Sequence, residues 1–110
     1  MIHVTVYRNE KEQCVGFRTV GHAGYGYSGQ DIVCAAVSVL TINTVNSIEA
    51  FSNDKTSLLT DEGKGLVDFR MKENPGKEAA LLLNAMLLGL NEIAGDENYE
   101  KYIDLTYEEV

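Results

Sequence analysis

Residues 21–34 read Gly21-His22-Ala23-Gly24-Tyr25-Gly26-Tyr27-Ser28-Gly29-Gln30-Asp31-Ile32-Val33-Cys34. The stretch separates an alternating, strand-like pattern from a long helical one. Glycine occupies four of the positions from 21 to 29, and it loses more backbone entropy on ordering than any other residue. The stretch therefore predicts a flexible loop over residues 21–29 and a helix from about Gln30 to Phe51, with Ser28 and Asp31 as a capping box.

Two strands precede the loop. Apolar and polar residues alternate from Ile2 to Tyr7, which is the period of a half-buried strand. A second strand is expected from about Cys14 to Val20, after a polar turn at residues 9–12. The short connection favours an antiparallel hairpin.

A second hairpin follows the first helix. Residues 57–60 and 66–71 flank a glycine-containing turn at residues 61–65. Alternation in the second of these strands puts three side chains on the core face. They are Val67, Phe69 and Met71.

A second helix and a last strand complete the pattern. The helix is expected to have Asn74 as its cap and Pro75 as its first residue, and to end at Gly95. Apolar side chains cover most of its circumference between residues 79 and 93, so it is predicted to be central or to contact a second subunit. Alternation resumes over residues 102–107 and indicates a strand.

The elements occur in the order ββαββαβ. The chain has 110 residues, which is about the length of one domain. Strand runs interrupted by two helices are typical of an α+β fold. We therefore predict a single domain over residues 1–110, in which two helices pack on a mostly antiparallel sheet.

Charge and cysteine content narrow the functional classes. The formal net charge is −8, which argues against direct nucleic-acid binding, because phosphate neutralisation needs Lys and Arg. The first residues lack the pattern of a signal peptide, and the apolar stretch from Leu81 to Leu90 is too short to span a bilayer. We expect a cytoplasmic protein without membrane contact, with Cys14 and Cys34 as free thiols and a disulfide between them as the alternative.

Cys34 and His22 are the residues best suited to chemistry. A helix that begins near Gln30 would put Cys34 in its first turn, where free backbone N–H groups and the helix dipole favour a thiolate. His22 ends the preceding strand, and consecutive elements are often neighbours in space, so its imidazole could be the base that a nucleophilic thiol needs. The alternatives are a cysteine that only packs in the core and a solvated, inactive histidine.

Asp31 and Ser38 are candidate supporting residues. Asp31 precedes Cys34 by three residues and Ser38 follows it by four, which puts both on the same side of the predicted helix. Asp31 would orient His22, cap the helix, or do both. Ser38 would hydrogen-bond within the site or to the helix backbone.

No cofactor or metal is expected. The glycine-rich stretch lacks the Gly-Lys-Ser or Gly-Lys-Thr end of a P-loop, and no dinucleotide-binding fingerprint follows a strand. The two cysteines and two histidines have no CxxC or HxxxH spacing and so do not form a zinc motif. Any reaction would therefore depend on side chains.

The block from Gly21 to Ser38 resembles the signature of the ribosomal-processing cysteine protease (Prp) family. The shared features are histidine after glycine, a glycine-rich loop, and then Asp31-x-x-Cys34-Ala35-Ala36-x-Ser38. The resemblance extends over the whole chain. It implies a cysteine protease in which His22 and Cys34 are catalytic, Asp31 and Ser38 are supporting, and Gly21 and residues 23–29 form the flexible loop that admits the substrate.

The resemblance also implies a substrate and a partner. Members of that family are small bacterial homodimers that remove an N-terminal extension from the large-subunit ribosomal protein numbered twenty-seven, through an acyl-enzyme. Two alternatives remain open. A non-catalytic module that docks on a ribosomal protein would use Cys34 only for packing, whereas a thiol-exchange protein would need Cys14 as a resolving thiol.

Overall fold

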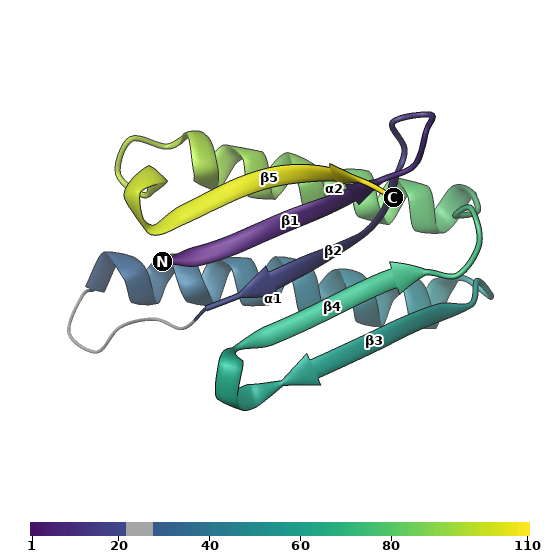
Figure 1. The fold of residues 1–110 in the computed structure, drawn as a ribbon, viewed down its shortest axis with the longest axis horizontal. Helices are drawn as coiled ribbons and strands as arrows, with labels where there is room; N and C mark the ends of the chain where they lie inside the picture. The colour runs from purple at the N-terminus through teal and green to yellow at the C-terminus, as the bar shows by residue number, and fades with distance from the viewer. Residues whose placement is uncertain (22–27) are drawn as a thin grey trace.

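The computed structural model describes residues 1–21 and 28–110, and for residues 28–31 it describes the backbone. Within these ranges the elements follow the predicted order ββαββαβ (Figure 1). They are β1 (Ile2–Arg8), β2 (Cys14–Val20), α1 (Ser28–Phe51), β3 (Thr56–Asp61), β4 (Leu66–Met71), α2 (Lys77–Gly95) and β5 (Ile103–Glu109). Short 3-10 helices precede β4 and β5, at Glu62–Lys64 and Glu100–Tyr102.

The strands form one sheet in the order β3-β4-β2-β1-β5. Paired strands are antiparallel, except that β1 and β5 run parallel. Val4 lies opposite Thr19, and Val6 lies opposite Phe17, so these four residues point to the same face of the sheet. The prediction of a mostly antiparallel sheet is confirmed.

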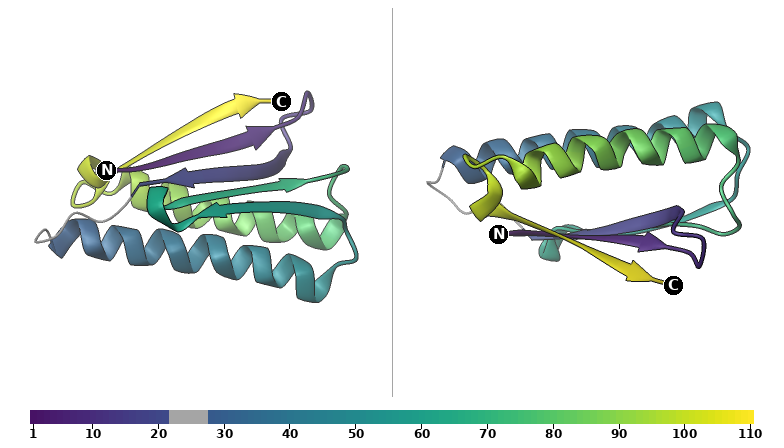
Figure 2. Two further views of the ribbon diagram at one scale, coloured as in Figure 1. Left: turned by 60° about the horizontal axis from the view of Figure 1, so that its bottom comes forward. Right: turned by 90° about the horizontal axis from the view of Figure 1, so that it is seen from above.

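Both helices cover one face of the sheet and leave the other face open (Figure 2). The core between the layers takes buried apolar side chains from both helices and from β1, β2, β4 and β5. Its members include Val4, Phe17, Val37, Phe69, Leu83 and Leu90. Full burial of a side chain of this size contributes about 1.5–3 kcal/mol, so the core holds the helices to the sheet. Phe69 and Met71 are buried in it and Val67 packs against it, as the hairpin pattern predicts.

The N-terminal cap of α2 differs from the prediction. Gly76 is the residue before the helix, so neither Asn74 nor Pro75 caps it. The N–H of Gly76 donates to Asp54 Oδ2 at 2.8 Å. A carboxylate from the α1–β3 connection therefore takes the place of a local cap.

The two helices expose apolar side chains on the sides that face away from the sheet. In α2, four residues face the core, namely Ala79, Leu83, Met86 and Leu90, whereas Leu81 and Leu88 are exposed. Both helices are long and apolar enough to cross a membrane by length and composition, so the expectation that no apolar stretch has this length is wrong. Core helices of globular proteins also have this length and composition. The buried sides of α1 and α2 pack against the sheet.

Several polar side chains interact on the open face of the sheet. The hydroxyl of Tyr7 donates to Asp68 Oδ2 at 3.1 Å, and the Arg70 guanidinium lies 4.1 Å from the centre of the Tyr7 ring. Burial, together with the adjacent Asp68 carboxylate, raises the pKa of Tyr7. On the same face, His3 Nδ1 lies 2.5 Å from Asp104 Oδ2, which links β1 to β5.

Candidate active site

A cavity of about 420 Å³ lies between α1 and the sheet. It is at the end of the molecule where β2 stops, α1 begins and β3 turns into β4 (Figure 1). Cys34 lines this cavity from α1 and is half-buried. The thiol is therefore accessible from a concave site, which is the setting that a nucleophilic cysteine requires.

The start of α1 differs from the prediction and changes the surroundings of Cys34. The helix begins at Ser28, so Ser28 and Gly29 are its first residues rather than the end of the loop. Cys34 lies six residues beyond the start, which is more than one turn, and it is not in the first turn as predicted. Because the helix dipole acts mainly over the first turn, it contributes little at Cys34.

Ser38 and Thr41 extend the polar side of α1 that lines the cavity. They follow Cys34 by four and seven residues, and all three contribute to the cavity wall. Thr41 is buried, and its Oγ1 donates to the carbonyl oxygen of Val37 at 2.8 Å. Ser38 is half-buried, so its hydroxyl is available on the same wall as the thiol.

Gly21 lines the same cavity directly after β2. Its φ of +122° is in a region that residues with a side chain rarely adopt. A β-carbon at this position would also lie 2.5 Å from the carbonyl oxygen of Met1. Conformation and contact together require glycine here, where the chain leaves the sheet at the cavity wall.

The remaining predicted site residues lie partly outside the described residues. His22 and residues 23–27 are among those outside. Asp31 belongs to α1 and precedes Cys34 by three residues, but its side chain is not among the described ones. The structure therefore brings Gly21, Cys34 and Ser38 to one cavity, whereas the pairing of His22 with Cys34 and the role of Asp31 stay predictions.

The end of β3 and the turn that follows it bring two carboxylates to the cavity. Asp61 and Glu62 both line it, next to Thr60. Asp61 Oδ1 accepts a hydrogen bond from Lys64 N at 3.3 Å, and Gly65 completes the turn with a φ of +59°. Among the described lining residues none is basic. Lys64 lies in the same turn but does not line the cavity, so the wall itself presents two carboxylates to a bound group.

Sequence reasoning missed several of these lining residues. Thr19 lies two positions after Phe17, so it is on the core face of β2. A polar residue at a core position could have indicated that Thr19 lines a cavity. Thr41 lies two helical turns after Cys34, which was a second signal. No sequence signal near Cys34 indicates that Thr60 and Asp61 lie beside the thiol. They reach this end of the sheet because β3 pairs with β4 and β4 pairs with β2.

The other thiol and the other imidazole lie elsewhere. Cys14 is 4% exposed and its Sγ donates to the carbonyl oxygen of Gly16 at 3.6 Å. Burial raises the pKa of this thiol, which suits a core residue and not a resolving thiol. Both cysteines are free. His3 is on the open face of the sheet, bound to Asp104, so His22 is the remaining histidine that could serve Cys34.

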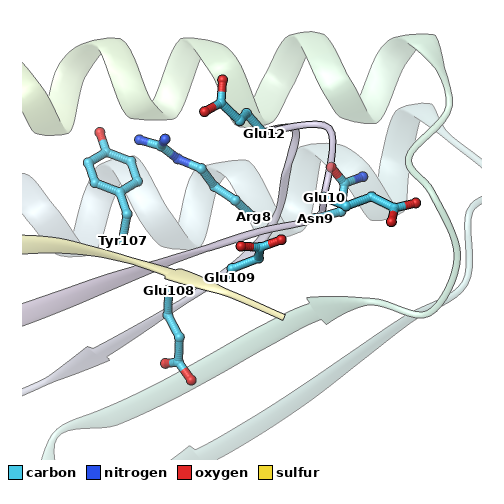
Figure 3. Close-up of a pocket in the computed structure, with 7 residues that line it drawn as sticks. All are labelled: Arg8, Asn9, Glu10, Glu12, Tyr107, Glu108 and Glu109. Atoms are coloured by element: carbon cyan, nitrogen blue, oxygen red, sulfur yellow. The ribbon is translucent and has the colours of Figure 1, made fainter.

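A second cavity, of about 280 Å³, is at the other end of β1 (Figure 3). Four glutamates line it together with Arg8, Asn9 and Tyr107, and the Arg8 guanidinium lies 3.6 Å from the centre of the Tyr107 ring. The described residues that line this cavity include neither a cysteine nor a histidine. Within the described part of the chain no group of three His, Cys, Asp or Glu side chains could hold a metal ion.

Comparison with known proteins agrees with a thiol-based site. Residues 1–104 match the family model described as cysteine protease Prp. The ribosomal processing cysteine protease Prp of Staphylococcus aureus is 32% identical over 107 residues, which are 97% of this chain and 99% of that protein.

Two crystal structures of the Staphylococcus aureus protease have the same fold. One, in complex with a substrate peptide, has a TM-score of 0.88 and 30% identity, over 98% of this chain and 100% of that chain. The other, in complex with a covalently linked product peptide, has a TM-score of 0.85 and 31% identity over the same shares. Taken with the cavity around Cys34, these matches establish that the chain belongs to the Prp family of cysteine proteases.

Proposed function

We propose that this protease removes the N-terminal extension of the large-subunit ribosomal protein numbered twenty-seven. The observation that carries the proposal is that the half-buried thiol of Cys34 lines a cavity together with Gly21, the residue before His22. The Staphylococcus aureus relative is named a ribosomal processing protease, and its structures contain substrate and product peptides. A peptide from a ribosomal protein is thus the substrate class that these relatives support.

The reaction proceeds through an acyl-enzyme. Cys34 Sγ attacks the scissile carbonyl carbon while His22 accepts the thiol proton. The tetrahedral intermediate collapses, the C–N bond breaks, and His22 donates that proton to the leaving amine. A water molecule, deprotonated by His22, then attacks the thioester and releases the carboxylic acid and the free thiol.

Asp31 and Ser38 support this pair in the proposal. They lie about one helical turn before and after Cys34, which puts both on its side of α1. The Asp31 carboxylate orients the His22 ring and stabilises its protonated form. The Ser38 hydroxyl hydrogen-bonds within the cavity, and residues 23–27 admit the peptide.

We further propose a cytoplasmic homodimer. What supports a dimer is the exposed apolar surface on the outer side of α1, where Ile32 and Val39 are 54% and 67% exposed. Light scattering on the purified protein should give about twice the 12.1 kDa mass of one chain. The measurement should use tens of micromolar protein, which is well above the dissociation constant of a stable dimer. A mass equal to one chain at this concentration would reject the dimer.

Mass spectrometry of the ribosomal precursor tests the activity and the cleavage site together. The wild type should release the extension as one fragment. The Cys34→Ala variant should lose at least about 1,000-fold in kcat/KM, because no nucleophile remains. The matched control is Cys14→Ala, which removes the buried thiol and should retain the wild-type cleavage site.

Each alternative has its own outcome in this experiment. Undiminished cleavage by the Cys34→Ala variant would remove the nucleophile assignment. Binding of the precursor without cleavage by the wild type would favour a non-catalytic module. Loss of activity in the Cys14→Ala variant, with folding intact, would favour thiol exchange.

A further inference from the structure

We infer that the open edge of β3 binds the backbone of the peptide substrate as an added strand and guides it to Cys34. This inference rests on the proposed function, because it concerns how that same cavity is filled. β3 is at the edge of the sheet in the strand order. An edge strand presents main-chain donors and acceptors to any extended peptide that lies beside it.

The pairing of β3 with β4 determines which groups are available. Lys72 N donates to the carbonyl oxygen of Lys55 at 3.0 Å, just outside the two strands. Hydrogen-bonded and non-hydrogen-bonded pairs alternate along an antiparallel ladder. Residues 57, 59 and 61 therefore bond to β4, whereas Thr56, Leu58 and Thr60 direct their N–H and C=O groups to the open side.

This open row leads into the cavity that contains the nucleophile. Thr60, the last residue of the row, lines the same cavity as Cys34. A strand rises about 3.3 Å per residue, so a peptide of four or five residues bonded along β3 reaches the cavity. The open row of β3 thus ends at the cavity wall.

The chemistry of β3 also distinguishes it from the other edge of the sheet. Proteins usually protect an edge strand with charges, proline or a bulge. β3 carries one charge, Asp61 at its last position, and no proline, and Leu58 and Leu59 are 54% and 62% exposed. The other edge, β5, carries Asp104, Glu108 and Glu109, two of which appear in Figure 3.

The side chains around this path select the peptide. Ile42 from α1 and Leu66 from β4 line the cavity beside Thr60 and offer an apolar wall. Asp61 and Glu62 add two carboxylates at the turn. The occupant is an extended peptide with an apolar side chain directed into the cavity and a basic side chain directed toward the turn.

A backbone-methylation series tests strand addition directly. The probes are synthetic peptides that span the extension junction of the ribosomal precursor, each with one N-methylated amide, bound to the Cys34→Ala protein. Every second methylation should raise Kd about fivefold or more, because one main-chain hydrogen bond is lost, and the intervening ones should have little effect. A series without this alternation would overturn the inference.

A protein variant gives an independent measurement. Leu58→Pro removes an open-side N–H and leaves the bonds to β4 in place, and Leu58→Ala is its matched control, since both lose the leucine side chain. The KM for the unmodified peptide should be about fivefold higher for Leu58→Pro than for Leu58→Ala, at similar kcat. Equal KM values would contradict strand addition. Should Leu58→Pro not fold, the methylation series still decides.

The outcomes separate this inference from the proposed function. If the wild type does not cut the unmodified peptide, the proposed function fails. If it cuts the peptide, but methylation gives no alternation and the two variants behave alike, strand addition alone is rejected. If Leu58→Pro converts a dimer to a monomer with KM unchanged, a second copy of the chain occupies the edge, and the inference is also overturned.

Discussion

Gly21 lies so close to Met1 that a β-carbon on it would be 2.5 Å from the Met1 carbonyl oxygen. The contact joins the start of β1 to the point where the chain leaves β2. Because Gly21 also lines the cavity of Cys34, the sheet determines where the glycine-rich stretch begins relative to the thiol. Glycine is needed here for position and not for flexibility alone.

A Gly21→Ala substitution should therefore impair both folding and activity. The strained backbone and the contact with Met1 should cost about 1–3 kcal/mol, measured by urea denaturation, and kcat/KM should fall further than the loss of folded protein explains. Gly95→Ala is the control, because a β-carbon there meets nothing within 4 Å. If Gly21→Ala were as stable and active as this control, the positioning role would be wrong.

The two thiols should differ in reactivity toward iodoacetamide. Cys34 lines a cavity and is half-buried, whereas Cys14 is buried and its pKa is raised. We expect modification of Cys34 in the native protein and of Cys14 only after unfolding, since the thiolate is the reactive species. Peptide mapping after a time course measures both rates. Equal native rates would contradict the structural distinction between the cysteines.

The strands and the core were predictable because their signals are local. Alternation over residues 2–7 and 66–71 has the period of a strand with one buried face, and the same residues form β1 and β4. The hairpin turn at residues 61–65 also follows from glycine and charge placement. These features need no knowledge of what lies across the sheet.

The errors arose where distant segments decide the local structure. The cap of α2 comes from Asp54, 22 residues before Gly76, so local preference for Asn74 and Pro75 gave the wrong start. α1 includes Gly29, although glycine in a helix costs about 1 kcal/mol relative to alanine. The wall formed by Thr60 and Asp61 depends on sheet pairing, which has no signature in the sequence near Cys34.

Removing the Tyr7 hydroxyl should lower stability and change its pH dependence. Tyr7→Phe loses the hydrogen bond to Asp68, which contributes about 1 kcal/mol. The pKa of Tyr7 is raised above its ordinary value of 10.0, so the unfolded chain loses the phenolic proton first. Its contribution is therefore complete below pH 10 and is lost as the pH rises through the folded-state pKa.

Denaturation of wild type and Tyr7→Phe from pH 7 to 11 checks this prediction. The wild type should lose free energy of unfolding above pH 10, and the variant should lose less over the same interval. Parallel curves for the two proteins would show that Tyr7 does not contribute to the alkaline loss.

Ser38→Ala should weaken catalysis without weakening the fold. Ser38 is half-buried on the cavity wall, one turn after Cys34. Loss of one hydrogen bond in the site should lower kcat/KM about tenfold, with a change in unfolding free energy below about 0.5 kcal/mol. Ser47→Ala, farther along α1, is the control. Equal kinetics for both variants would restrict Ser38 to a structural role.

The two histidines offer a sharp test of the base. His3 is bound to Asp104 on the open face of the sheet, so His3→Gln should lose the link between β1 and β5 and keep its activity. His22→Gln should lose about 100- to 10,000-fold in kcat/KM, because a positioned base contributes that much. Glutamine retains hydrogen-bonding groups but cannot shuttle the proton, so the contrast isolates acid–base function.

The pH dependence of kcat/KM tests the role of His22 in a second way, besides the loss of activity. Wild-type kcat/KM should depend on the ionisation of both the thiol and the imidazole, whereas residual activity of His22→Gln should rise steadily with pH as thiolate accumulates without a base. Such a rise requires that Cys34 remain accessible in the cavity, which the structure describes. A His22→Gln profile that matches the wild type in shape and size would assign the base to another residue.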